Sequence, residues 1–140
     1  MAIIVASCCP ERVMFFSTTD VSFAWRIHDG SNSVPVRVPQ ISDATALTAG
    51  GAFACALRVG GSVACWGNGQ IGQLGNGVYE NNSGVPEPQT VIGIDDALSI
   101  SSGWNHTCVV RSDQTVWCWG GNGDGATAYG SLGNGSNDQR

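Results

Sequence analysis

Two pairs of cysteines share one spacing, and their thiols have the widest choice of chemistry in this sequence. The pairs are Cys55 with Cys65 and Cys108 with Cys118, each ten positions apart. The midpoint of each pair lies in a turn between two apolar runs, which predicts a β-hairpin. The two cysteines of a pair then face each other on neighbouring strands, close enough in a non-hydrogen-bonded position to form a disulfide.

Three other roles for these cysteines stay open at this point. Reduced cysteine often fills a core as a small apolar residue. Structural zinc sites normally have more closely spaced ligands than these pairs offer. A catalytic thiol needs a base, and His106 projects from the same strand face as Cys108, but Phe53 stands at the matching place before Cys55. Disulfides would place the protein in an extracellular or cell-envelope location, whereas free thiols would favour the cytoplasm.

An internal repeat with a period of 53 residues contains both hairpins. A shift by this period aligns CALRVGGSVACWG (55–67) with CVVRSDQTVWCWG (108–120), with six identities in thirteen positions. The alignment extends backwards over DATALTAG and DALSISSG, and forwards the motif LGNG recurs after an insertion of five residues. A period near 50 residues is typical of propeller arrays rather than of helical solenoids.

The repeated segments predict strands, and glycines interrupt every window long enough to hold a helix. We therefore expect an all-β protein with two propeller-type repeats, at about 34–86 and 87–140, the last of them incomplete. Residues 1–33 are either a degenerate N-terminal repeat or an unmatched segment. In the degenerate copy, Met14 and Ala24 stand where the hairpin cysteines would be.

The segment WGNGQIGQLGNG, Trp66 to Gly77, resembles the signature W-G-x-N-x-x-G-Q-L-G-x-G of the regulator of chromosome condensation repeat family. The second copy, SSGWNHTCVVRSDQTVWCWGGN, matches the family pattern better still, and then departs at the five-residue insert and at Ser131, which stands in place of Gln. The resemblance implies a β-propeller of four-stranded blades, usually seven. At ~50 residues per blade this chain forms a partial propeller, too short to close a ring alone. It is then a fragment of a longer chain or assembles from copies, and the hairpin cysteines are similar to those of bacterial and secreted members.

The resemblance also implies structural roles for residues at tight turns, at close backbone approaches and between blades. These are Gly50, Trp66, Gly67, Gly72, Leu74, Gly75, Gly103, His106, Trp119, Gly120, Leu132 and Gly133.

Composition narrows the range of partners. The formal net charge is −5, with six arginines and no lysine, so no basic patch for nucleic acid is predicted. No apolar run approaches the ~20 residues of a membrane span. Open blade edges could support self-association.

A non-enzymatic protein-binding or scaffold module is the function that these patterns favour. No Ser-His-Asp order, paired carboxylates or phosphate-binding loop can be placed, and no cofactor or metal is expected. The long connections at 78–89 and 123–130 are candidate partner-binding loops, with Tyr79, Glu80 and Tyr129 as candidate contacts. The alternative is a guanine-nucleotide exchange factor-like regulator of a small GTPase, the activity for which the family is named.

Overall fold

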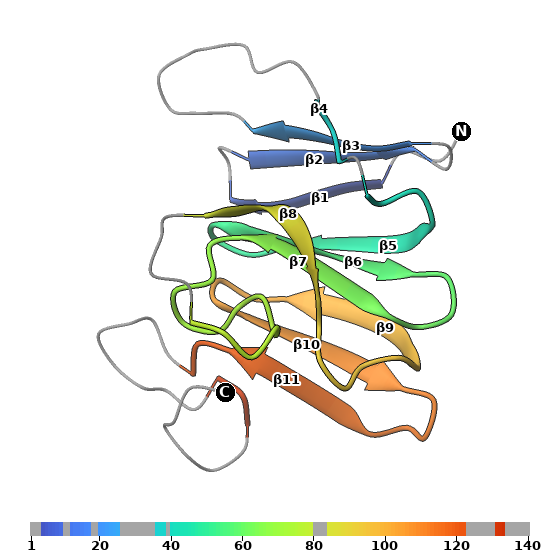
Figure 1. Cartoon of the computed structure of the whole chain (residues 1–140), viewed down its shortest axis with the longest axis vertical. Coiled ribbons are helices and arrows are strands. Elements are labelled where there is room, and N and C mark those ends of the chain that lie inside the picture. The colour runs from blue at the N-terminus through green and yellow to red at the C-terminus, as the bar shows by residue number, and fades with distance from the viewer. Residues whose placement is uncertain are drawn as a thin grey trace.

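The computed structural model describes residues 4–9, 12–17, 20–25, 36–38, 40–79, 84–122 and 131–133, with side chains described from Val38 onward. Eleven strands in these residues form three antiparallel sheets (Figure 1). The expected all-β, partial-propeller fold is confirmed. The described residues contain no helix long and apolar enough to cross a membrane.

The three sheets follow one another along the chain. The first consists of β1 (Ile4–Cys9), β2 (Arg12–Ser17), β3 (Asp20–Trp25) and β4 (Val36–Arg37). The middle sheet consists of β5 (Ala44–Ala49), β6 (Phe53–Arg58), β7 (Val63–Gly67) and β8 (Val85–Thr90). The third sheet consists of β9 (Ala97–Ser102), β10 (His106–Arg111) and β11 (Val116–Gly120).

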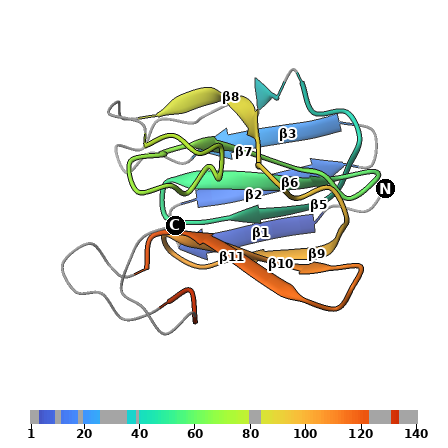
Figure 2. The same cartoon turned by 60° about the horizontal axis from the view of Figure 1, so that its bottom comes forward.

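The first strands of the sheets are the inner strands of an open propeller. β5 contacts both β1 and β9, and Figure 2 shows these three strands side by side. Strands then follow in order outward within each sheet. This radial order is the arrangement of propeller blades around an axis.

The sheets are offset from the sequence repeats by one strand. β4 pairs with β3 of the first sheet, although Val36 and Arg37 begin the repeat predicted at 34–86. In the same way β8 pairs with β7, although most of β8 belongs to the following repeat. Each four-stranded sheet therefore takes its outer strand from the start of the next repeat.

The N-terminal segment forms a sheet of its own, with a register that differs from the degenerate repeat expected there. Met14 pairs with Phe23, and Ala24 pairs with Val13 instead. Ser17 pairs with Asp20, so only two residues separate these strands, fewer than in the cysteine hairpins. The shorter loop moves the register by one position, because loop length sets hairpin register.

Two buried clusters cover the two faces of the middle sheet. One lies between the middle and third sheets and includes Phe53, Leu57, Val63, Leu74, Val91, Ile94, Val109 and Trp119. The other lies on the opposite face and includes Val38, Ile41, Ala54, Ala56, Ala64 and Trp66. The middle sheet is thus buried on both sides, as expected for an internal blade.

Candidate protein-docking surfaces

Both cysteine hairpins have the register that their spacing predicted. Cys55 pairs with Cys65, and Cys108 pairs with Cys118, with Cα–Cα distances of 4.0 and 4.1 Å. Each pair is joined by a disulfide bond. The first disulfide is fully buried against the third sheet, whereas the second is partly exposed. No group of three or more His, Cys, Asp or Glu that could hold a metal ion occurs among the described residues.

At the start of each cysteine hairpin, a glycine packs against the aromatic ring that lies two residues before the first cysteine. Gly50 lies under the Phe53 ring, and Gly103 lies under the His106 ring, with no room for a side chain in either place. In both copies the glycine N–H donates to the carbonyl of the aromatic residue, at 2.9 Å. At His106 the acceptor of this hydrogen bond is the backbone carbonyl.

Gly67 and Gly120 end the two returning strands at matching positions. Both have φ +103°, a conformation that favours glycine. A Cβ atom at either position would lie within 2.6 Å of a backbone oxygen, from Ala52 or Asn105. The next residue of each copy donates its N–H to that same oxygen, at 2.8 Å. These glycines let the strand end close against the hairpin entrance.

A repeated ion pair, which the sequence analysis did not identify, ties each hairpin to the strand before it. Arg58 bonds to Asp43 at 2.7 Å, and Arg111 bonds to Asp96 at 2.6 Å. Arg111 and Ser112 both donate hydrogen bonds to the Asp96 carboxylate, and these bonds hold the pKa of Asp96 below its usual value. The hydrogen bond to Asp96 in turn raises the pKa of Arg111. The sequence did contain a signal for this ion pair, because the aspartate and the arginine are both identical in the two copies of the repeat.

Hydrogen bonds within the second hairpin turn act on another carboxylate. The hydroxyl and the backbone N–H of Thr115 both donate to Asp113, at 2.6 and 2.9 Å. These bonds lower the pKa of the Asp113 carboxyl. The Asp113 side chain thus stabilises the turn of the second cysteine hairpin. The turn of the middle hairpin instead contains two glycines with positive φ, Gly60 and Gly61.

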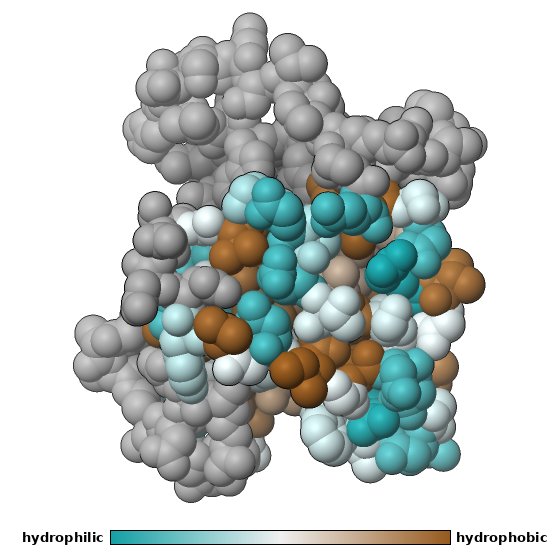
Figure 3. All heavy atoms as spheres, viewed as in Figure 1, coloured by the Kyte–Doolittle hydropathy of each residue, from teal (hydrophilic) through white to brown (hydrophobic). Residues whose placement is uncertain are grey.

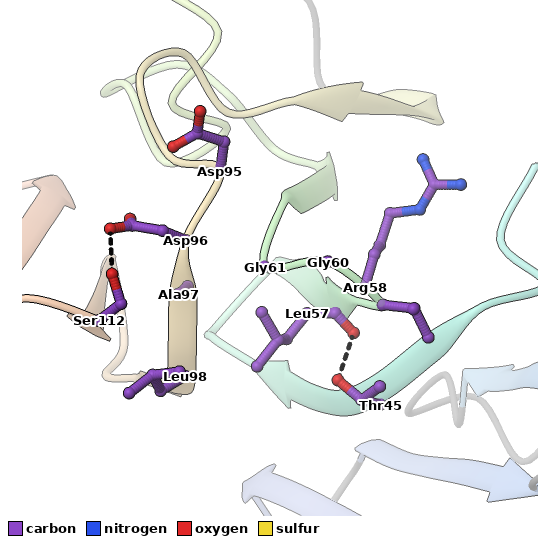
Figure 4. Close-up of a pocket in the computed structure, with 11 residues that line it drawn as sticks. Thr45, Leu57, Arg58, Gly60, Gly61, Asp95, Asp96, Ala97, Leu98 and Ser112 are labelled. Atoms are coloured by element: carbon purple, nitrogen blue, oxygen red, sulfur yellow. Dashed lines mark hydrogen bonds between the residues drawn. The ribbon is translucent and has the colours of Figure 1, made fainter.

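An open groove of about 460 Å³ lies between the turn of the middle hairpin and the start of β9 (Figure 4). Figure 4 shows Asp96 bonded to Ser112 on one side and the Arg58 side chain pointing away from the groove. Exposed Val59 and Leu98 add apolar surface to its walls. The Asp96 carboxylate at this groove is paired with Arg111.

The signature loop at 68–77 seals the outer side of the contact between the middle and third sheets. Leu74 is fully buried there, and the indole N–H of buried Trp119 donates to the carbonyl of Gln73 at 3.0 Å. Trp66 is buried in the cluster on the other face of the middle sheet. Each signature tryptophan therefore lies on the face of its own sheet opposite the disulfide: Trp119 faces the middle sheet, and Trp66 faces away from the third sheet.

Of the remaining repeat residues, Gly75 and Leu132 lie in packed positions, and Gly72 and Gly133 have positive φ angles. Gly75 adjoins Val91 and Trp119, and Gly72 has φ +81° in the same loop. Leu132 is buried and donates its N–H to the Asn122 side chain at 2.8 Å, and Gly133 follows with φ +66°.

Three exposed apolar side chains lie at the end of the signature loop or on the segment that bonds to it. Val78, Tyr79 and Ile92 are 51%, 54% and 69% exposed, and we call them the loop patch. Gly77 lies beside Ile92, and the Ile92 N–H donates to the carbonyl of Gly75 at 2.9 Å. Tyr79 had been identified from the sequence, whereas Ile92 had not; Glu80 and Tyr129 lie outside the described residues.

A further exposed aromatic residue was also missed. Trp104 is 62% exposed at the entrance of the second hairpin, where its ring lies over Gly51. The Gly51 N–H donates to the Trp104 carbonyl, which joins the hairpin entrances of the middle and third sheets.

Comparison with known proteins agrees with this architecture. Two family models, both described as the regulator of chromosome condensation (RCC1) repeat, match residues 60–110 and 98–126. The human E3 ubiquitin-protein ligase HERC2 is 27% identical over 91% of this chain and 3% of its own length. The ultraviolet-B receptor UVR8 of Arabidopsis thaliana is 34% identical over 64% of this chain and 19% of its own. The chain thus spans a small part of these relatives.

Solved structures show the same fold. Yeast RCC1 (Prp20), in a crystal structure with Kap60, matches with a TM-score of 0.60 and 26% identity over 79% of this chain and 28% of that one. Human WBSCR16 matches with a TM-score of 0.65 and 16% identity, over 84% and 33%. Sheets arranged radially in this way define a β-propeller repeat protein. Between residues 60 and 126 the chain contains repeats of the regulator of chromosome condensation (RCC1) type.

Proposed function

We propose that this chain is a non-enzymatic protein-binding module, and that the loop patch is part of its binding surface. The observation that carries the proposal is the exposure of three large apolar side chains on a loop that backbone hydrogen bonds hold in place. Exposed apolar patches held on a rigid framework are typical of protein-docking sites. On the face drawn in Figure 3, hydrophobic surface lies in several separate patches between hydrophilic residues, which favours binding through a local patch on this face.

Proteins with similar repeats support a protein-binding function. Propeller repeats of this family serve as protein-interaction modules. The solved structures of yeast Prp20 describe it with Kap60 and report its binding to Gsp1p and histones. We extend to this chain only the ability to bind a protein, since it spans 28% of Prp20.

The loop patch can be tested by comparing the protein with a variant that carries both Tyr79→Ser and Ile92→Ser. Proteins that bind the unmodified chain should bind this variant at least about tenfold more weakly, because apolar contacts at the centre of an interface supply most of its binding energy. Val110→Thr, on an exposed apolar side chain of β10 outside both the loop patch and the groove, is the control.

Equal binding by all three proteins would rule out the loop patch, and the absence of any specific partner would rule out the binding function. Acceleration of guanine-nucleotide release from a small GTPase would instead favour the exchange-factor alternative.

We also propose an extracellular or cell-envelope location. It is supported by the two disulfide bonds, which persist in oxidising compartments. Free thiols at all four cysteines in protein purified without reductant would contradict this location.

A further inference from the structure

The groove at the turn of the middle hairpin has apolar walls that the repeat does not require. Val59 and Leu98 both line it and are 67% and 66% exposed. A shift by the period of 53 residues aligns Val59 with Ser112 and Leu98 with Thr45, so the other copy has a hydroxyl residue in each place. The fold therefore accepts polar side chains at both positions. Two exposed apolar side chains on one groove, where the fold needs neither, favour an apolar ligand there.

The floor of the groove is also apolar, and its backbone is fixed by hydrogen bonds. Leu57 and Ala97 line the groove and are both buried. The Ala97 N–H donates to the Gly61 carbonyl at 2.9 Å, and the Val59 N–H donates to the Asp43 carbonyl at 2.8 Å. These bonds join the hairpin turn to the chain at the starts of β9 and β5. A groove held in this way needs little ordering when a ligand binds, which favours affinity.

The charged groups around the groove leave one carboxylate in excess. Arg58 is paired with Asp43, and its side chain points away from the groove (Figure 4). Arg111 is shared by two carboxylates, since its Nε lies 2.6 Å from Asp96 and its Nη2 lies 3.8 Å from Asp95. The Asp95 side chain, which lines the groove, is 87% exposed. One negative charge beside apolar walls complements a ligand that carries a positive charge next to an apolar group.

These features together indicate the class of ligand. A protein segment can supply a large apolar side chain and a guanidinium or ammonium group on neighbouring residues. The groove volume of about 460 Å³ lies within the usual range of ligand sites. Nucleic acid is disfavoured, because the net charge of the chain is −5 and the excess carboxylate would repel phosphate groups. A short basic and apolar segment of a protein is therefore the ligand that fits best.

We propose that this groove binds a segment of a partner protein in which an arginine or lysine stands next to large apolar residues. The apolar side chains of the segment pack against Val59 and Leu98, and its basic side chain lies beside the Asp95 carboxylate. Apolar contact supplies most of the affinity, and the charge selects basic segments over acidic ones. This inference deepens the proposed protein-binding function, on which it rests, through a surface separate from the loop patch.

An NMR titration of the 140-residue chain tests this proposal, with the end-blocked peptide Gly-Leu-Arg-Leu-Gly as the probe. The peptide should shift the backbone amide signals of Gly61, Ala97 and Leu98. At low salt its Kd should be at least about fivefold lower than that of the same peptide with glutamate in place of arginine, because the glutamate is repelled by Asp95. No shift at these amides, or equal affinity for the two peptides, would overturn the proposal.

Substitutions taken from the aligned positions of the repeat separate the two contributions. A variant with both Val59→Ser and Leu98→Thr should bind the arginine peptide at least about tenfold more weakly, because it loses the apolar walls. Asp95→Asn should bind it about threefold more weakly and should reduce the preference over the glutamate peptide. Val110→Thr, outside the groove, is the control and should bind normally. Unchanged binding by Asp95→Asn, which tests the groove even if the double variant does not fold, would overturn the proposal.

Two further outcomes separate this proposal from others. Shifts of the same amide signals that grow with protein concentration in the absence of peptide would identify a second copy as the occupant and overturn the partner segment. The variant with Tyr79→Ser and Ile92→Ser should keep full peptide binding, and the variant with Val59→Ser and Leu98→Thr should keep the partners of the loop patch. Loss of the groove proposal with those partners still bound would leave the proposed function standing, so the two can fail independently.

Discussion

Gly60 and Gly61 lie in the same turn with similar φ angles, but only Gly61 is also closely packed. Gly60 and Gly61 have φ +90° and +89°, but a Cβ at Gly60 would meet nothing, whereas one at Gly61 would lie 2.7 Å from the Asp96 Cα. The Ala97 N–H donates to the Gly61 carbonyl at 2.9 Å, so the turn is fastened to the third sheet there. Glycine is therefore required at position 61 both by the φ angle of the turn and by the close contact with the third sheet.

Gly61→Ala should lower the free energy of unfolding by about 3 kcal/mol, because it combines an unfavourable φ with a backbone clash. Gly60→Ala should cost only about 1 kcal/mol, since the strained φ is its sole penalty. Denaturant unfolding of both variants measures the difference. Equal losses would mean that the contact between the turn and the third sheet adds nothing to stability.

At the scale of a single hairpin, the Asp96–Arg111 pair makes stability depend on pH. The pKa of Asp96 is lowered in the folded protein, so its carboxylate favours folding above the unfolded pKa of about 4, and this contribution is lost as the pH falls through the folded value. Asp96→Asn should be less stable than the unmodified chain at neutral pH, and the difference should shrink below about pH 4.

Thermal unfolding between about pH 2 and pH 7 measures this difference. Asp95→Asn is the control, because its exposed side chain lies 3.8 Å from Arg111 and such surface pairs contribute little. A gap between Asp96→Asn and the unmodified chain that stays constant with pH would show that the carboxylate charge is not what stabilises the hairpin.

At the scale of the whole molecule, the positions of the sheets make two similar disulfides unequal. Cys55 and Cys65 are 0% exposed because the third sheet covers them, whereas Cys108 and Cys118 lie on a face that no described sheet covers. The same contrast holds for aligned Val63 and Val116, which are 0% and 62% exposed.

Reduction under native conditions should therefore open Cys108–Cys118 at least about tenfold faster than Cys55–Cys65, since the latter requires the sheets to separate. Alkylation after timed exposure to reductant, followed by peptide mass mapping, measures both rates. Alkylation without reductant should modify none of the four. Equal rates would show that the contact between the middle and third sheets opens readily.

The repeat made the register of the cysteine hairpins predictable, because equal spacing around a turn leaves one way to oppose the two residues. The ion pair of Asp43 with Arg58 was not predicted, since its partners lie fifteen positions apart and meet only when β5 and β6 pair. Ile92 was missed for a related reason. It follows buried Val91 in an apolar run, which suggests a buried residue. In the structure the Ile92 backbone N–H bonds to the signature loop, and the side chain is exposed.

The offset between repeats and sheets bears on how such a protein can grow through gene duplication. Copying one period of 53 residues, from any starting point, adds one strand to the preceding sheet and supplies the inner strands of a new one. Every internal sheet is therefore complete after each duplication. A truncation after Thr90 would leave the middle sheet whole, whereas one at the sequence boundary near Pro86 would remove most of its outer strand.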